Sequence, residues 1–314
     1  MTEIPVISGE AVFAAVDPKT AIQQTREAFE RYGRGEWSMP AKVYLESPPH
    51  GDFRAMPALG DGLALLKWVT SFPGNSARGL PVVRGEVLLS DAETGEELAV
   101  IECSSVTSLR TGSAAALSAQ VLAAEGASTV GIIGCGVNGA WAARCLAAAG
   151  YGPGVCADPR VDPAEALADE LGWRAGDRGE AAAQDVVVTV TPGEELVILD
   201  SDLRSGQHFA VLGADAHGKQ EVDLAVIERC RLFCDEWEQA SAGGELANAV
   251  DAGLAGRDDV TQVGDVLNGA SGRTADDEIT LFDSTGLAIQ DLAICRAVYE
   301  RWRNGELEAP VVTL

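Results

Sequence analysis

The sequence predicts an α/β protein in which a doubly wound parallel sheet is joined to a smaller α+β domain. Three observations lead to this prediction. Short β-rich runs occupy residues 41–102, strands alternate with helices from residue 128 onward, and a glycine-rich turn connects the first of those strands to the next helix. Strands that alternate with helices are typical of parallel sheets with right-handed crossovers. A chain of 314 residues is long enough for two such domains.

The N-terminal domain is expected to contain one early helix and a mainly antiparallel sheet. Asp17 and Pro18 precede apolar residues at helical spacing that continue to Gly33, which is typical of a capped helix with proline in its first turn. Turn residues separate five runs that predict strands, AKVYLE, GDFRAMP, LALLKWVTS, VVRGEVLLS and ELAVIE. Residues 105–124 then show helical periodicity and should lead the chain out of this domain.

The second domain is predicted from strands and helices that follow one another in turn. The expected strands are STVGIIG, a run that ends at Asp158, DVVVTV, HFAVLG and CRLFCDE, with helices over 137–149 and 163–171. After EITLFDSTG, the amphipathic stretch 287–302 is expected to form a helix that returns to the first domain. The predicted domains are therefore 1–118, completed by 287–314, and 119–286.

The charge of the chain excludes two classes of partner. It has 23 Lys and Arg residues against 48 Asp and Glu residues, so its net charge is −25. Such a surface repels nucleic-acid phosphates and anionic lipids. The N-terminus has no basic stretch followed by an apolar one, and the apolar runs are far shorter than the ~20 residues of a membrane span. We therefore expect a soluble, cytoplasmic protein without nucleic-acid or membrane partners.

Cysteine and histidine are too scattered to predict a disulfide framework or a metal site. The seven cysteines are an odd number and, apart from Cys230 and Cys234, lie far apart in the sequence. The three histidines, His50, His208 and His217, also lack the spacing of metal ligands. We expect free, buried thiols and no bound metal.

The segment GCGVNG at 134–139 matches the pattern G-x-G-x-x-G and predicts a Rossmann-type dinucleotide site. The pattern is weak alone, but here it follows the apolar run 129–133 and precedes the helical segment AWAARCLAAAG. Its glycines permit a tight turn and the close approach of a pyrophosphate, which a helix N-terminus attracts. A glycine-rich turn without a ligand is the alternative. The residues assigned to cofactor binding here are Gly134, Gly136, Val137, Asn138 and Gly139.

Two charged residues bear on the choice between NAD and NADP. Asp158 ends the next predicted strand, where its carboxylate could accept hydrogen bonds from the adenosine ribose hydroxyls. A 2′-phosphate would meet this negative charge, so NAD(H) is the expected cofactor. Arg160 could accommodate such a phosphate, which leaves NADP(H) possible. The cofactor-binding set also includes Thr191 and Ser284.

Four cations are candidates for binding a substrate carboxylate. Lys67 lies inside the apolar run LALLKWV, where burial of an unpaired ammonium is unfavourable. A lysine that reaches solvent at a strand edge is the alternative. Lys42 and Arg54 lie in neighbouring predicted strands, and Arg110 is near the start of an otherwise uncharged helix. Together they would form a carboxylate clamp in which arginine supplies bidentate geometry.

Asp215 is the candidate acid/base residue. It follows the predicted strand HFAVLG, and ligands of parallel sheets bind beyond the carboxyl ends of the strands. A carboxylate there could reach a cleft between the domains and exchange protons with a substrate. Capping of a turn is the alternative role.

Seven segments resemble the ornithine cyclodeaminase/mu-crystallin family. They are GDFRAMPA at 51–58, LLKWVTSFPGN at 65–75, RGLP at 78–81, SLRTGSAAA at 108–116, VGIIGCGVNG at 130–139, LGADAHGKQEVD at 212–223 and LFDSTGLAIQDL at 281–292. The resemblance implies a homodimer built through the non-nucleotide domain, bound NAD(H) or NADP(H), and chemistry at the α-carbon of an amino acid. Lys67 and Arg110 match the family's substrate-carboxylate ligands, and Asp215 matches its catalytic aspartate.

Within this family, the pair of Lys42 and Arg54 resembles the alanine dehydrogenases of archaeal type. Ornithine-using members have an acidic residue at the position of Arg54, which holds the distal amine that an arginine would repel. The resemblance therefore implies an NAD(H)-dependent oxidoreductase of amino-acid metabolism, an amino-acid dehydrogenase or imine reductase, with Lys67 and Asp215 as catalytic residues. A cyclodeaminase that retains NAD and a nucleotide-bound small-ligand binding protein of mu-crystallin type are the alternatives.

Overall fold

The computed structural model describes residues 3–216 and 218–313, so His217 lies outside the described residues. The chain divides into two compact units. Unit 1 comprises the residues up to Arg110 together with those from Leu287 onward, and unit 2 comprises Thr111–Gly286. The division lies earlier than the boundary expected after residue 118, because helix α3 (Cys103–Leu122) contributes its first turns to unit 1 and the remainder to unit 2.

Unit 1 is built on a seven-stranded sheet. Its strands are β1 Glu3–Ile7, β2 Val43–Ser47, β3 Gly51–Gly60, β4 Leu63–Ser71, β5 Val83–Asp91, β6 Glu97–Glu102 and β15 Val311–Thr313. Their order across the sheet is β15-β1-β6-β5-β4-β3-β2. The predicted antiparallel arrangement is confirmed from β2 to β6. The sequence does not predict β1, which is parallel to β6, or β15, which is antiparallel to β1.

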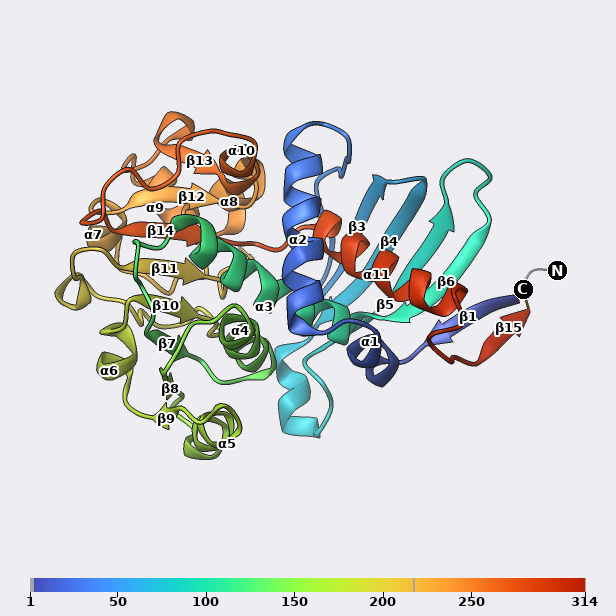
Figure 1. Ribbon diagram of the computed structural model, residues 1–314, viewed down its shortest axis with the longest axis horizontal. Helices are drawn as coiled ribbons and strands as arrows, with labels where there is room; N and C mark the ends of the chain where they lie inside the picture. The colour runs from blue at the N-terminus through green and yellow to red at the C-terminus, as the bar shows by residue number, and fades with distance from the viewer. Residues whose placement is uncertain (1–2, 217, 314) are drawn as a thin grey trace. The chain divides into compact units, whose positions relative to one another are not determined.

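Helix α11 (Ala288–Arg303) covers one face of this sheet, where it packs against β3 and β4. Helix α2 (Pro18–Gly33) lies beside α11 (Figure 1). It begins where the sequence predicts, because the Asp17 carboxylate accepts a hydrogen bond from Thr20 N at 2.7 Å and Pro18 occupies the first turn. Two shorter helices complete the unit, α1 Gly9–Ala15 and the 3₁₀ helix η1 Pro73–Arg78.

Unit 2 is built on an eight-stranded sheet in which all neighbouring strands are parallel. Its strands are β7 Val130–Ile133, β8 Gly154–Ala157, β9 Arg174–Ala175, β10 Val186–Thr189, β11 His208–Val211, β12 Arg231–Cys234, β13 Val260–Gln262 and β14 Thr280–Asp283. Their order is β13-β12-β14-β11-β10-β7-β8-β9, which confirms the predicted doubly wound sheet. After β7 the chain adds β8 and β9 on one side of it, and from β10 onward it adds strands on the other side. The switch point therefore lies between β7 and β10, and ligands of such sheets bind there.

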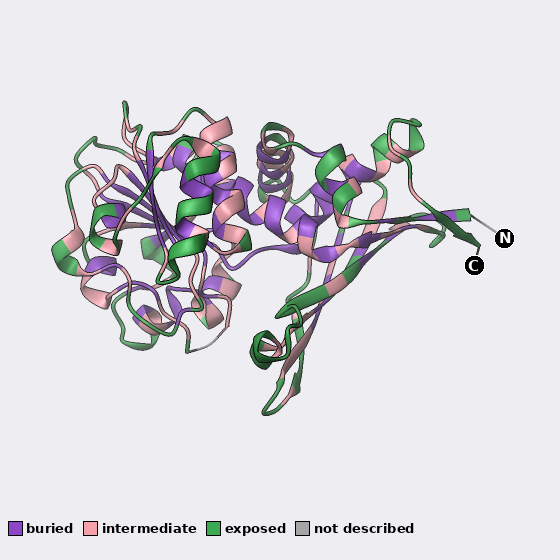
Figure 2. Cartoon of the chain, turned by 90° about the horizontal axis from the view of Figure 1, so that it is seen from below, coloured by how far each residue is buried: buried purple, intermediate pink, exposed green. Residues whose placement is uncertain are grey.

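The strands at the centre of this sheet are buried along their length, as Figure 2 shows. The connecting helices are α4 Val137–Ala148, α5 Val161–Leu171, α6 Arg178–Ala182, α7 Leu224–Ile227, α8 Trp237–Gly243, α9 Ala247–Asp251 and α10 Val263–Leu267, with the 3₁₀ helices η2 Asp200–Asp202 and η3 Arg257–Asp259. Within the described part of the chain, no helix combines the length and the apolar character needed to cross a membrane.

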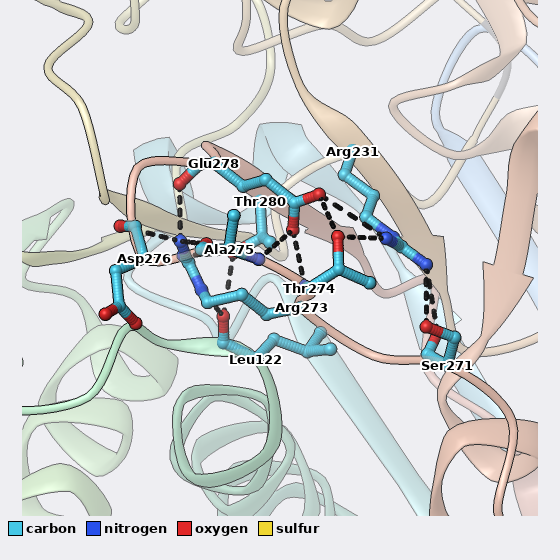
Figure 3. A network of polar contacts seen from close by, with 9 residues as sticks. All are labelled: Leu122, Arg231, Ser271, Arg273, Thr274, Ala275, Asp276, Glu278 and Thr280. Atoms are coloured by element: carbon cyan, nitrogen blue, oxygen red, sulfur yellow. Dashed lines mark hydrogen bonds and ion pairs between the residues drawn. The ribbon is translucent and has the colours of Figure 1, made fainter.

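Arg273 ties the segment before β14 to the end of α3 (Figure 3). Its guanidinium donates to the carbonyl oxygen of Leu122 at 2.7 Å, to that of Gln207 at 3.0 Å and to the Thr280 hydroxyl at 3.0 Å. Leu122 is the last residue of α3, and the final carbonyls of a helix have no partner inside it. Arg273 therefore stabilises a helix end within unit 2.

The buried imidazole of His208 should make the stability of unit 2 sensitive to acid. Its Nδ1 lies 2.9 Å from Thr280 Oγ1, and its Nε2 lies 3.0 Å from Ser118 Oγ. Burial, assisted by the charge of Arg273, lowers the pKa of His208 to about 3. The pKa in an unfolded chain is about 6.5. As the pH falls from about 6.5 towards 3, the unfolded chain binds a proton that the native protein does not, so the free energy of unfolding decreases.

Replacing His208 by glutamine should make this decrease shallower, by at most about 1.4 kcal/mol per pH unit. Urea denaturation at several pH values between 3 and 7 measures the effect. The matched control is His50→Gln, because His50 is exposed. Equal pH dependence of stability in the wild type and in His208→Gln would contradict the prediction.

Candidate functional site

The glycine-rich turn connects β7 to the N-terminus of α4, as the sequence predicts. Gly134 has a φ of +98°, and a Cβ there would overlap the carbonyl oxygen of Val190. A Cβ on Gly139 would overlap the carbonyl oxygen of Gly134. A Cβ built on Gly136 meets, among the described residues, only a guanidinium nitrogen of Arg160 within 4 Å, at 4.0 Å. Open space and positive charge beside a helix N-terminus fit a pyrophosphate.

Asp158 follows β8 and holds the turn in place. Its side chain is 3% exposed and accepts hydrogen bonds from Cys135 N at 2.8 Å and from Arg160 N at 2.9 Å. Arg160 Nε also donates to it at 2.9 Å. Burial opposes ionisation of Asp158, but these hydrogen bonds outweigh burial and lower the pKa of the carboxyl group. The residue expected to bind the ribose is therefore ionised at neutral pH and also supports the loop that would hold the pyrophosphate.

The other residues predicted to bind the cofactor follow strands of the same sheet or begin α4. Val137 and Asn138 form the first turn of α4, where Val137 is 69% exposed. Thr191 follows β10, and its hydroxyl accepts a hydrogen bond from Gly193 N at 3.2 Å. Ser284 follows β14, is buried, and donates its hydroxyl to Asp235 at 3.1 Å. The Ser284 N–H also has a protein partner, because it donates to the carbonyl oxygen of Val211 at 3.0 Å.

Lys67 lies on the buried face of β4, where its side chain is 1% exposed. Its Nζ donates to Thr107 Oγ1 at 2.7 Å and to Asp291 Oδ1 at 2.9 Å. An ammonium has three N–H donors, so a third can bind a substrate oxygen. The alternative of a lysine that reaches solvent at a strand edge is wrong, because β4 lies inside the sheet between β3 and β5.

Arg110 approaches the same carboxylate from α3. Its Nε lies 3.7 Å from Asp291 Oδ1, and its side chain is mostly buried. Lys67 and Arg110 therefore converge on Asp291, which is fully buried in the first turn of α11. Neither Asp291 nor Thr107 is predicted from the sequence. The only signal for Asp291 is its place inside LFDSTGLAIQDL, one of the segments that resemble the family.

Arg54 lies on the same face of the sheet as Lys67. Met56 is directly opposite Lys67 in the pair of β3 and β4, and residues 54 and 56 of one strand share a face. Arg54 Nε donates to Asp52 Oδ1 at 2.6 Å, and the Arg54 guanidinium lies 5.3 Å from the centre of the Tyr44 ring.

Three of the four predicted cations of unit 1 pair with carboxylates. Asp52 and Asp291 carry two negative charges and pair with Arg54, Lys67 and Arg110. Lys42 is half-buried and directly precedes β2, the strand next to β3. Cationic side chains at a binding site favour a ligand with a carboxylate over a ligand with a distal ammonium.

Asp215 lies in the loop after β11, as the sequence predicts. Its Oδ1 accepts a hydrogen bond from Lys219 Nζ at 2.6 Å, and both side chains are about one third exposed. A carboxylate that is accessible to solvent can exchange protons with a ligand or with water. Asp215 belongs to unit 2, and the four cations belong to unit 1.

Glu221 is a candidate for a supporting role that the sequence does not reveal. Its buried carboxyl group accepts hydrogen bonds from Thr191 N at 2.7 Å, from Gly213 N at 2.8 Å and from Thr189 Oγ1 at 2.8 Å. Burial raises the pKa of Glu221, although these hydrogen bonds oppose the shift. Glu221 therefore joins the loop that carries Thr191 to the loop that leads to Asp215.

Known proteins are similar to this chain in sequence over most of its length. The model of the ornithine cyclodeaminase/mu-crystallin family matches residues 6–150 and 167–306. The alanine dehydrogenase of Archaeoglobus fulgidus is 40% identical over 95% of this chain and 95% of its own. The iminosuccinate reductase of Paracoccus denitrificans is 35% identical over 73% of this chain and 74% of its own. The solved structure of an archaeal alanine dehydrogenase dimer with bound NAD matches with a TM-score of 0.95 at 38% identity, and the match covers 100% of both chains.

Proposed function

This chain belongs to the ornithine cyclodeaminase/mu-crystallin family, and from that premise we propose that it is an NAD(H)-dependent oxidoreductase acting at the α-carbon of a small amino acid or its imine. The relatives named above are a dehydrogenase and a reductase. One observation carries the proposal. The buried Lys67 ammonium is paired with Asp291 and keeps a donor for a substrate, in a chain that also has a dinucleotide-binding turn.

NAD(H), when bound, supplies or accepts the hydride. The turn at 134–139 and the N-terminus of α4 would hold its pyrophosphate, because backbone N–H groups and the helix dipole attract anions there. Asp158 would accept hydrogen bonds from the adenosine ribose. Thr191 and Ser284 follow β10 and β14, at the carboxyl edge of the sheet where nucleotides bind.

The cations of unit 1 would bind and polarise the substrate. Arg110 offers a planar guanidinium to the substrate carboxylate, and Lys67 offers its third N–H donor. An ammonium next to a carbonyl or imine also stabilises the negative charge that develops on the carbonyl oxygen or imine nitrogen when a hydride adds to the carbon. Because these side chains are cationic and would repel a distal ammonium, a small neutral or acidic 2-oxo acid or imino acid is preferred over a diamino acid.

Asp215 would exchange protons with the reacting nitrogen or with water. Hydride transfer to or from the α-carbon changes the charge on the attached nitrogen, and imine formation or hydrolysis releases or consumes water. Both steps need a proton acceptor that solvent can recharge. The partial exposure of Asp215 supports this role.

A spectrophotometric screen tests the proposed function. NADH and NADPH oxidation are followed with pyruvate, other 2-oxo acids with ammonia, and cyclic imines, and pyruvate with ammonia is the first pair to try. Ammonia release from ornithine and lysine with catalytic NAD is measured in parallel. Net turnover of NADH with a 2-oxo acid or imine supports the proposal, whereas ammonia release from a diamino acid without net NADH change would identify a cyclodeaminase.

The cofactor preference should depend on Asp158. We expect the wild-type protein to bind NADH at least about tenfold more tightly than NADPH, a difference of about 1.4 kcal/mol. Asp158→Asn should narrow this preference, because it removes the negative charge that a 2′-phosphate would meet. Fluorescence titration of both nucleotides measures it, with the exposed Asp162→Asn as the control. Tighter binding of NADPH by the wild type would reverse the assignment.

The sheet face of unit 1 opposite Lys67 supports the proposal of a homodimer. Trp68 and Leu66 alternate with Lys67 along β4 and are 39% and 38% exposed. Neighbouring strands add Val43, Leu45, Leu59 and Leu88 as further exposed apolar residues. The Trp68 ring stacks on Phe53 at 5.6 Å. Continuous apolar surface of this kind is typical of a protein interface, and the archaeal alanine dehydrogenase of known structure is a dimer.

Trp68→Glu should convert the dimer to a monomer, because it places a charge at the centre of this apolar face. Light scattering at micromolar protein should give twice the chain mass for the wild type and about the chain mass for the variant. Val161→Glu, which changes an exposed apolar residue of unit 2, is the control and should remain dimeric. A monomeric wild type would refute the proposed dimer.

A further inference from the structure

The carboxylate of Asp291 connects two of the residues proposed to bind substrate. Its Oδ1 lies 2.9 Å from Lys67 Nζ and 3.7 Å from Arg110 Nε. The two cations belong to different elements, β4 and α3, and Asp291 belongs to a third, α11. One buried oxygen thus accepts a hydrogen bond from Lys67 and lies within ion-pair distance of Arg110, although the two cations share no backbone element.

Among the described residues, Asp291 is the carboxylate in ion-pair contact with Lys67, and the Asp52–Arg54 pair lies further along the same face of β3. From α11, Asp291 and the Cys295 thiol face it, and from α3, Cys103, Thr107 and Arg110. Burial raises the pKa of both thiols, so they are uncharged at neutral pH. The residues paired with Lys67 on the adjacent strands, Met56 and Val87, are apolar. Asp291 is therefore the group that offsets the repulsion between Lys67 and Arg110 and the desolvation of the ammonium.

The position of Asp291 in its helix also suits a permanent negative charge. It lies in the first turn of α11, a helix of 16 residues whose N-terminal N–H groups favour an anion. Its Oδ2 is buried and has no hydrogen-bond partner among residues 3–216 and 218–313. Within the described residues, the two cations are therefore the groups that hold this carboxylate.

We propose that Asp291 is a positioning residue that directs both Lys67 and Arg110 towards the substrate carboxylate. This inference rests on the proposed function, because it assigns a role to Asp291 only through residues proposed to bind substrate. It makes Asp291 essential to substrate binding although the side chain itself is fully buried and does not contact the substrate.

Asp291→Asn tests the inference in the full-length protein, once the wild type has shown NADH turnover with a 2-oxo acid. We expect kcat/KM for the 2-oxo acid to fall by about tenfold or more, with a raised KM, while the Kd for NADH changes less than about twofold. The rise in KM should exceed the fall in kcat, because Asp291 acts on the side chains that bind the substrate carboxylate. Glu300→Gln, which removes an exposed charge on the same helix, is the control and should leave both kcat/KM and the Kd for NADH unchanged.

Asp291→Glu provides a second test and the only one needed if Asp291→Asn does not fold. It keeps the charge but displaces it by one methylene group, so kcat/KM should fall, with a raised KM, while the Kd for NADH stays at its wild-type value. Wild-type kcat/KM in Asp291→Asn or in Asp291→Glu would overturn the inference and leave the proposed function intact. A wild type without NADH turnover would instead reject the proposed function.

Discussion

Replacing Lys67 by methionine is expected to lower kcat for 2-oxo acid reduction by about 10²- to 10⁴-fold. Methionine keeps the length and the apolar stem of lysine but has no N–H donor, so it can neither bind the substrate carboxylate nor polarise the reacting carbonyl. Initial rates at saturating NADH measure the effect. Lys19→Met changes an exposed lysine of the same unit and should retain wild-type turnover.

The same substitution should also destabilise the protein, and a second variant separates the two effects. Lys67→Met leaves the buried Asp291 without its hydrogen-bonded cation and with Arg110 at 3.7 Å; breaking a buried ion pair typically costs about 3–5 kcal/mol. The double variant Lys67→Met, Asp291→Asn removes both charges and should regain part of that stability while it remains inactive. Turnover of Lys67→Met above about a third of the wild-type value would remove Lys67 from the mechanism.

Replacing Asp215 by asparagine is the second change expected to have a large effect, again a loss of about 10²- to 10⁴-fold in kcat. Asparagine keeps the shape of the side chain but cannot take up a proton near neutral pH. The ion pair with Lys219 is about one third exposed, so its loss should change the free energy of unfolding by no more than about 1 kcal/mol. Rates of amino-acid oxidation and of 2-oxo acid reduction should fall together.

Two further measurements decide whether Asp215 acts as a base. Asp251→Asn, an exposed aspartate of the same unit, should leave turnover unchanged. Added formate should restore part of the activity of Asp215→Ala, because a small carboxylate can occupy the space of the missing one. If Asp215→Asn keeps more than about a third of wild-type turnover, the proton is exchanged by another group.

Lys67→Met and Asp215→Asn should affect KM and kcat differently. Lys67 is proposed to bind the substrate carboxylate in the ground state as well as to polarise the reacting group, so Lys67→Met should raise the KM of the 2-oxo acid. Asp215 is proposed to act only in proton transfer, so Asp215→Asn should lower kcat with little change in KM. This difference would show which residue acts in substrate binding and which acts only in proton transfer.

Much of the fold could be predicted because it depends on short-range backbone preferences. Asp17 and Pro18 mark the start of α2, and the glycines at 134–139 mark the turn between β7 and α4. β1 and β15 could not be predicted in the same way. Each is short, and each owes its strand conformation to a partner far away in the chain, as the pairing of Glu3 with Thr313 shows.

By itself the sequence determined the α/β architecture, the dinucleotide-binding turn and the unusual position of Lys67, since all three follow from residues close together in the chain. Only the tertiary structure decided what pairs with that lysine. Thr107 and Asp291 lie 40 and 224 residues from it; α11 packs against β4 and brings Asp291 to Lys67, and the N-terminal part of α3 brings Thr107 there. Strand periodicity places Arg54 and Met56 on one face, but it cannot say which face is buried. Helix α11 decides that by covering one face of the sheet, because burial depends on what packs against a strand and not on the strand's own pattern.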